Sequence, residues 1–329
     1  EGLQYRIQFG PELQYYRLGI ANAADGINGD GRNIAQYNPS NKVSWTLDNL
    51  VYYNKTIAKN HRIGVTLLQS ASKYHSENGN IKAYVASAEE LWWNTSSLGN
   101  PQAYSTGLTE TSLASYMARV NYTYADKYML TASVRSDGAS QLSDGHKWAS
   151  FPSVALGWRI DQEKFMQKAD FISNLKLRLG YGISGNYAVS AYATQGAVQS
   201  NYYAWGSMDP TVGYLPSDAS AKNPNKMANL DLGWEKTKQW NLGLDFGFIN
   251  NRISGSVDYY HNKTTDLILA TTIPSLTGYT STYANVGETS GWGLDLQLNA
   301  IPVKTKDFEW NTSLTWTIDR NRVDKLNNG

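Results

Sequence analysis

Cysteine is missing from this chain of 329 residues. Its absence excludes disulfide bonds, thiolate metal sites and a cysteine nucleophile, although it does not identify the cellular compartment. Long hydrophobic runs are missing too, since no stretch approaches the roughly 18 apolar residues of a membrane-spanning helix. No signal peptide is visible. The first ten residues, EGLQYRIQFG, already alternate like a strand, so we expect the beginning of the protein to lie outside this sequence.

An excess of charge of either sign is also missing. The formal net charge is +1, which gives no indication of a basic surface for nucleic acid. Phenylalanine is scarce, with 7 residues against 23 tyrosines and 11 tryptophans. Tyrosine and tryptophan combine an apolar ring with a polar tip, so this composition favours surfaces that have one apolar side and one wet side.

Strict alternation of apolar and polar residues is the main pattern in the chain, and helical periodicity is nearly absent. The hairpin at 128–160 is an example, with two alternating segments around a tip rich in glycine, serine and aspartate. A short helix is expected only within 161–171. The eleven segments predicted as strands are 3–9, 43–53, 61–69, 114–124, 128–134, 154–160, 175–183, 240–248, 253–259, 292–298 and 310–318.

The connections between these segments alternate between short and long. The short ones are 55–60, 125–127, 161–174, 249–251 and 302–307, and the long ones are 10–41, 70–110, 137–147, 184–235 and 262–288. Soluble sandwiches mix loop lengths because of their Greek-key crossovers. Outer-membrane barrels have short periplasmic turns and long extracellular loops. We therefore predict an all-β fold, a transmembrane antiparallel up-and-down β-barrel, with a soluble β protein as the alternative.

Strand length and aromatic placement agree with that prediction. Ten residues at about 3.3 Å each, tilted by about 40°, rise roughly 25 Å, which is the height of the apolar band of such barrels. Aromatic residues crowd the short turns, as Tyr124 and Tyr128 do around 125–127. The polar side of each strand should then line the lumen. Eleven strands are an odd number, so we expect them to be part of a larger barrel.

Several blocks of the sequence resemble the SusC-like branch of the TonB-dependent outer-membrane transporters of Bacteroidetes. They are YMLTASVRSDGAS…KWASFPSVALGWRIDQEKFM, NLKLRLGYGISGN (174–186), LGWEKTKQWNLGLDFGFINNRISGSVDYYHNKTTDLIL (232–269) and NVGETSGWGLDLQLN (285–299). They stand in the family's order and cover roughly half of the chain, whereas 1–110 matches in pattern only. DGASQL and SGWGLDL depart from the family's usual runs without affecting the fold assignment.

The resemblance implies a 22-stranded barrel in the bacterial outer membrane, of which 1–329 is the C-terminal half. The plug domain and the segment that contacts TonB–ExbB–ExbD are absent from this chain. It further implies import of a large nutrient, most often an oligosaccharide and less often a peptide, together with a SusD-like surface lipoprotein that acts as a lid. The protein is not expected to be an enzyme. A passive porin or a surface adhesin barrel is the alternative function.

Two groups of residues are candidates for contact with a ligand. Aromatic residues on the two longest loops suit stacking on sugars or contact with the lid, and packing between loops is the structural alternative. These are Trp92, Trp93, Tyr202, Tyr203 and Trp205. Four arginines lie on the polar parity of their strands and should face the lumen, where they contact substrate or pair with carboxylates. They are Arg119, Arg135, Arg159 and Arg178.

Other motifs give weaker indications. GYGISG (180–185) satisfies G-x-G-x-x-G, but no helix pattern follows, so we expect no dinucleotide site. The histidines at 61, 75, 146 and 261 lack metal-ligand spacing and are expected at surfaces or turns. In DGINGDG (25–31), an Asx/Gly turn is the favoured interpretation. A calcium site built on Asp25, Asn28 and Asp30 is the alternative, and no other cofactor is expected.

Overall fold

The structure of the protein, a computed structural model, describes residues 2–27, 31–85, 99–195, 198–204, 210–216, 226–277 and 279–326. Its main element is an eleven-stranded sheet in the order β1-β2-β3-β4-β5-β6-β7-β11-β12-β15-β16, and every pairing from β5 onward is antiparallel. Within the described residues no helix is long and apolar enough to cross a membrane. The prediction of an all-β, up-and-down architecture with eleven strands is confirmed.

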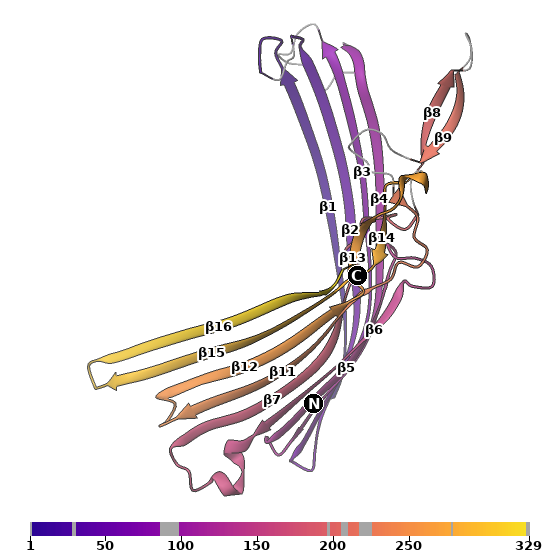
Figure 1. Cartoon of the computed structure of the whole chain (residues 1–329). Coiled ribbons are helices and arrows are strands. Elements are labelled where there is room, and N and C mark those ends of the chain that lie inside the picture. The colour runs from indigo at the N-terminus through magenta and orange to yellow at the C-terminus, as the bar shows by residue number, and fades with distance from the viewer. Residues whose placement is uncertain are drawn as a thin grey trace. The chain divides into compact units, whose positions relative to one another are not determined.

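The strands of this sheet follow one another along the chain, and each predicted segment overlaps one of them. Their bounds are β1 Gly2–Asn22, β2 Ile34–Ile57, β3 His61–Val85, β4 Gly99–Tyr124, β5 Tyr128–Ala139, β6 Trp148–Arg159, β7 Ile172–Asn186, β11 Glu235–Phe248, β12 Ile253–Thr265, β15 Glu288–Lys304 and β16 Glu309–Lys325. Figure 1 shows β5, β6, β7, β11, β12, β15 and β16 side by side in one sheet.

The chain divides into two compact units. Unit 1 comprises Glu1–Arg6, Asn49–Gln69 and Ser115–Gly329, and unit 2 comprises Ile7–Asp48 and Ser70–Ala114. Unit 2 holds residues 7–22 of β1, 34–48 of β2, 70–85 of β3 and 99–114 of β4, most of which lie beyond the predicted strand segments. Its buried apolar side chains are Ile34, Ala35 and Ala83.

The first four strands are much longer than predicted. They have 21, 24, 25 and 26 residues, so the connections expected at 10–41 and 70–110 are wrong in extent. Gly10 and Pro11 look like a turn signal, yet β1 passes through both. Cross-strand hydrogen bonding thus overrides the local turn propensity.

The strand register divides unit 1 into an apolar and a polar face. One row of directly paired residues crosses seven strands and is apolar throughout: Leu130, Leu156, Leu179, Leu242, Tyr259, Leu294 and Ile318. The next row along, which points to the opposite face, is Thr131, Ala155, Gly180, Asn241, Tyr260, Gly293 and Asp319. Because the rows stay in register, each face is continuous.

Short turns join the strands at one end, as predicted. The turn between β2 and β3 and the turn between β4 and β5 contain residues with positive φ, among them Lys59 and Asp126, as tight hairpin turns require.

The predicted short helix at 161–171 takes the form of two single-turn 3₁₀ helices, Ile160–Gln162 (η2) and Lys164–Met166 (η3). Between them Glu163 accepts hydrogen bonds from Tyr128 Oη at 2.5 Å and Trp158 Nε1 at 3.1 Å. The hydrogen bond from Tyr128, followed by the one from Trp158, lowers the pKa of Glu163.

The long connections hold structure that the sequence pattern did not predict. One contains the hairpin of β8 (Val198–Ala204) and β9 (Pro210–Pro216). Another small sheet has the order β10-β14-β13, from Lys226–Met227, Ser281–Asn285 and Ile268–Thr272. Next to these segments lie the buried side chains of Leu142, Leu232, Phe151 and Trp234. The core of unit 1 therefore sits among its long connections, beyond the sheet that alternation predicts.

Candidate functional site

Arg178 is the centre of an ion cluster on the polar face. Its guanidinium donates from Nε and Nη2 to the two carboxylate oxygens of Asp245, at 2.9 and 2.7 Å. It also reaches Asp258, with Nη1 at 2.9 Å from Oδ1 and Nη2 at 3.0 Å from Oδ2. The three side chains come from β7, β11 and β12, so one cation holds three strands together. All three are partly exposed, at 32, 27 and 21% of the side chain.

Glycines make room for this cluster and for a neighbouring ring. A Cβ added to Gly243 would lie 2.5 Å from Asp258 Oδ1 and 2.6 Å from Arg178 Cζ. Two strands along, the Tyr260 ring lies over Gly293 where a Cβ would otherwise be. The Tyr260 hydroxyl donates to Asp319 Oδ1 at 3.2 Å. The glycines of these strands thus serve close packing on the polar face, which spacing alone did not indicate.

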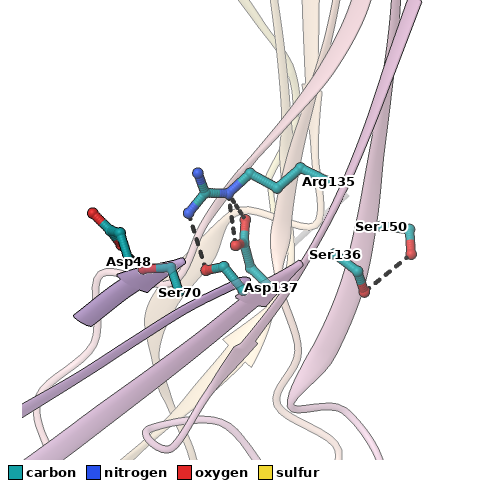
Figure 2. Close-up of polar contacts among 7 residues, drawn as sticks. Asp48, Ser70, Arg135, Ser136, Asp137 and Ser150 are labelled. Carbon is teal, nitrogen blue, oxygen red and sulfur yellow. Dashed lines mark hydrogen bonds and ion pairs between the residues drawn. The ribbon is translucent and has the colours of Figure 1, made fainter. Parts of the chain in front are cut away.

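The other predicted arginines have separate surroundings. Arg135 Nε donates to both oxygens of Asp137, at 2.7 and 3.0 Å, and Nη2 donates to the buried Ser115 hydroxyl at 3.0 Å (Figure 2). Arg159 Nη2 donates to Asp161 Oδ2 at 3.0 Å. Arg119 is exposed and makes no ion pair with any residue that the structure describes. The four arginines therefore do not form one site, and their position in the lumen stays a prediction.

A hollow of about 350 Å³ lies beside Arg178 on the same sheet. Gly180 and Gly182 form its floor, and a Cβ added to Gly180 would meet nothing within 4 Å. Polar side chains surround it, namely Thr131, Ser153, Ser184, Gln239 and Asn241. The glycine motif that resembles a dinucleotide fingerprint therefore lies within strand β7 and opens space on the sheet surface.

Hydrogen bonds to backbone join the long connections of unit 1. The Asn285 side chain accepts from Gly233 N at 2.7 Å and donates to Gly233 O and Asp266 O, each at 2.9 Å. The Ser143 hydroxyl donates to Asn229 O at 2.7 Å and accepts from Leu232 N at 3.1 Å. Each side chain satisfies backbone groups that loops leave unpaired. These connections thus form a packed layer at the end of the sheet opposite the short turns.

The predicted aromatic ligand contacts lie largely outside the described part of the chain. Trp92, Trp93 and Trp205 are not among the described residues, and for Tyr202 and Tyr203 the structure gives the backbone of β8 only. Asn28 and Asp30 of the calcium alternative also lie outside it, whereas Asp25 is an exposed turn residue. Both ideas stay predictions. Within the described ranges, no group of three or more histidine or carboxylate side chains could hold a metal ion.

A polar cluster in unit 2 was not predicted. His75 Nδ1 lies 2.9 Å from Glu110 Oε1, and His75 Nε2 lies 3.1 Å from Glu77 Oε1. Lys73 Nζ is 3.0 Å from the same Glu110 oxygen. The hydrogen bond with Glu110, and then that with Glu77, raises the pKa of His75. Glu110 is far in sequence from the other three residues, so only the pairing of β3 with β4 brings it beside them.

The family comparison matches nearly the whole chain. The model described as "TonB dependent receptor-like, beta-barrel" matches residues 2–329. Among curated proteins, the TonB-dependent receptor SusC of Bacteroides thetaiotaomicron is 39% identical over 225 residues, 67% of this chain and 22% of that protein. The TonB-dependent receptor P3 of Formosa agariphila is 30% identical over 338 residues, covering 100% of this chain and 32% of that protein.

Solved structures agree with the sequence relatives. The structure of the RagAB peptide transporter is similar over 99% of this chain and 35% of its own, with a TM-score of 0.86 and 26% identity. The chain thus spans between about a fifth and a third of the length of these proteins.

Proposed function

Since this chain belongs to the TonB-dependent receptor-like β-barrel family, we propose that it forms part of an active importer for a large nutrient. The family places it in the bacterial outer membrane as a SusC-like transporter barrel. The observation that carries the proposal is the match of the family model over residues 2–329. In this interpretation the apolar face of the sheet contacts lipid and the polar face lines the lumen.

Two relatives support the further proposal of substrate and partner. The resemblance to the SusC-like branch implies an oligosaccharide as substrate and a SusD-like lipoprotein as lid, and the 39% identity to the TonB-dependent receptor SusC supports membership of that branch. The likeness to the structure of the RagAB peptide transporter supports the second candidate, a peptide. Energy would come through TonB–ExbB–ExbD, since the outer membrane has no nucleotide supply.

Energy dependence separates active import from a passive porin or an adhesin. Uptake of a labelled nutrient should stop in cells that lack TonB and in cells treated with a protonophore. The same cells should keep normal amounts of folded protein in the outer membrane. Uptake that continues unchanged without TonB would favour the porin alternative, and surface attachment without uptake would favour the adhesin.

The aromatic residues of the two long loops provide a test of ligand and lid contact. Replacing Trp92, Trp93, Tyr202, Tyr203 and Trp205 by alanine should leave the barrel folded, because loops contribute little to the sheet. Direct stacking on substrate predicts that the purified complex loses ligand binding while the lipoprotein still co-purifies. A lid contact predicts the reverse. Unchanged growth, ligand affinity and co-purification would leave packing between loops as their role.

A further inference from the structure

A cluster of cationic side chains lies on the apolar face, at the strand ends away from the short turns. We call these five residues the basic patch: Lys236, Lys238, Lys263, Arg320 and Arg322. They occupy the same parity as Leu242, Tyr259 and Ile318, so they share the face that contacts lipid. All five are exposed. The patch therefore continues the lipid-facing surface.

An aromatic row marks the boundary between the apolar surface and the patch. The directly paired residues Tyr181, Trp240, His261 and Trp292 cross β7, β11, β12 and β15. Such rings are typical of the level where hydrocarbon meets headgroups. The next row on this face pairs Ile183, Lys238, Lys263, Ser290 and Arg322, about 7 Å further along the strands. The patch thus begins at headgroup depth.

The pairing within the patch is unfavourable without an anion. Lys238 lies directly opposite Lys263, and like charges in directly opposed positions destabilise a sheet. Lys263 Nζ contacts Glu288 Oε2 at 2.7 Å, and Arg322 Nε contacts Asp324 Oδ1 at 2.7 Å. Within the described residues, Lys236, Lys238 and Arg320 have no carboxylate partner. Among the described residues, nothing therefore balances these three positive charges on the lipid-facing surface.

We propose that the basic patch binds the phosphate groups of anionic lipid headgroups in the surrounding membrane. Charge complementarity and continuity with the lipid-facing surface favour a lipid over a soluble anion. Lysine and arginine side chains at this depth extend their charged tips toward headgroups while their stems stay on apolar surface. Because the long connections are extracellular in this family's topology, the lipid belongs to the outer leaflet. The proposal does not depend on the imported nutrient.

The test compares two lipids and two variants in protein purified from outer membranes. Retained lipid is counted by native mass spectrometry after mixing with phosphatidic acid or with phosphatidylcholine of the same acyl chains. One variant combines Lys236→Gln, Lys238→Gln and Lys263→Gln. The control removes the same charge near the short turns, with Lys164→Gln, Lys168→Gln and Lys306→Gln, all of them exposed. Heat-modifiability on gels verifies that both variants are folded.

We expect the unaltered protein and the control variant to retain phosphatidic acid in preference to phosphatidylcholine. The patch variant should lose that preference by about tenfold or more, since each cation near an anionic surface contributes about 1 kcal/mol. Equal retention by both variants, or no preference in the unaltered protein, would overturn the proposal. Loss of the preference in excess inorganic phosphate would also overturn it, because the site would then take a soluble anion.

Discussion

At the scale of single residues, glycines on the polar face determine which larger side chains can lie flat on the sheet. Arg178 and Asp258 meet above Gly243, at distances that leave no space for a methyl group. Gly180 lies on the same face over open space. The two positions therefore differ in what a small addition would disturb, although sequence alternation treats them alike.

Replacing Gly243 by alanine should displace the Arg178 guanidinium from its two carboxylates. Overpacking of this kind costs about 1–3 kcal/mol. Urea or heat unfolding of the reconstituted barrel measures the loss, and Gly180→Ala is the matched control, since its new methyl group meets no atom within 4 Å. Equal stability of the two variants would show that the ion cluster does not constrain this part of the sheet.

His75 provides a pH-dependent contact in unit 2, on the part of β3 that follows the predicted strand segment 61–69. Hydrogen bonds with Glu110 and Glu77 raise its pKa above the ordinary value of about 6.5. A raised folded-state pKa means that the stabilisation is complete below the ordinary value. It is lost as the pH rises through the folded-state value.

Glu110→Gln should therefore lower the titration midpoint of His75. Proton NMR of the imidazole C2 resonance measures the midpoint, and His75→Gln assigns the signal among the four histidines of the chain. His146→Gln leaves the Glu110 contact intact and serves as the control. A His75 midpoint that is the same with glutamate and glutamine at position 110 contradicts the assigned hydrogen bond.

At the scale of the strand, the pairing register decides which face of the sheet each side chain points to. Leu244 pairs with Leu177 and Val257 on the apolar face, whereas Asn241 pairs with Gly180 and Tyr260 on the polar face. Because the side-chain period is two, a shift of one residue would exchange the faces along the whole strand.

Leu244→Arg should destabilise the folded barrel by about 2–4 kcal/mol if the residue lies near the bilayer midplane. Asn241→Arg should cost much less, because its side chain points to the wet face. The fraction of heat-modifiable, folded protein in outer membranes measures both. If the two variants lose folded barrel to the same degree, the assignment of faces is wrong.

Alternation predicted these strands well because each strand core is exposed to two different solvents, one on each face. It failed where that contrast ends. From Gly10 to Asn22 the strict alternation breaks down, with Tyr15 and Tyr16 adjacent, while β1 still pairs with β2. The ion cluster of Arg178 was missed for another reason. The alternating pattern placed Arg178 on the polar face. Only the pairing register, however, brings Asp245 and Asp258 beside its guanidinium.

At the scale of the whole molecule, the alternation of short turns and long connections sets the topology. The exposed residue Gly145, with φ of 83°, lies in the long connection between β5 and β6. Asn250 lies in the short turn between β11 and β12. In the family's topology these two positions are on opposite sides of the membrane.

An epitope tag inserted at Gly145 should be labelled by antibody on intact cells. A tag at Asn250 should be labelled only after the outer membrane is permeabilised. Immunoblots of outer membranes control for the amount of each tagged protein. Labelling of the Asn250 tag on intact cells would invert the topology.

The separation of the main sheet from its long connections bears on how such proteins diversify. The chain forms small extra strands between β7 and β11 and between β12 and β15. Even so, β7 pairs directly with β11, and β12 pairs directly with β15. Doubling the length of a flexible loop costs only about 0.6 kcal/mol in closure entropy. One charged residue placed in the hydrocarbon costs several times more. New ligand specificities can therefore arise by insertion into the connections at little cost to the barrel, whereas a charge introduced on the lipid-facing surface would destabilise it.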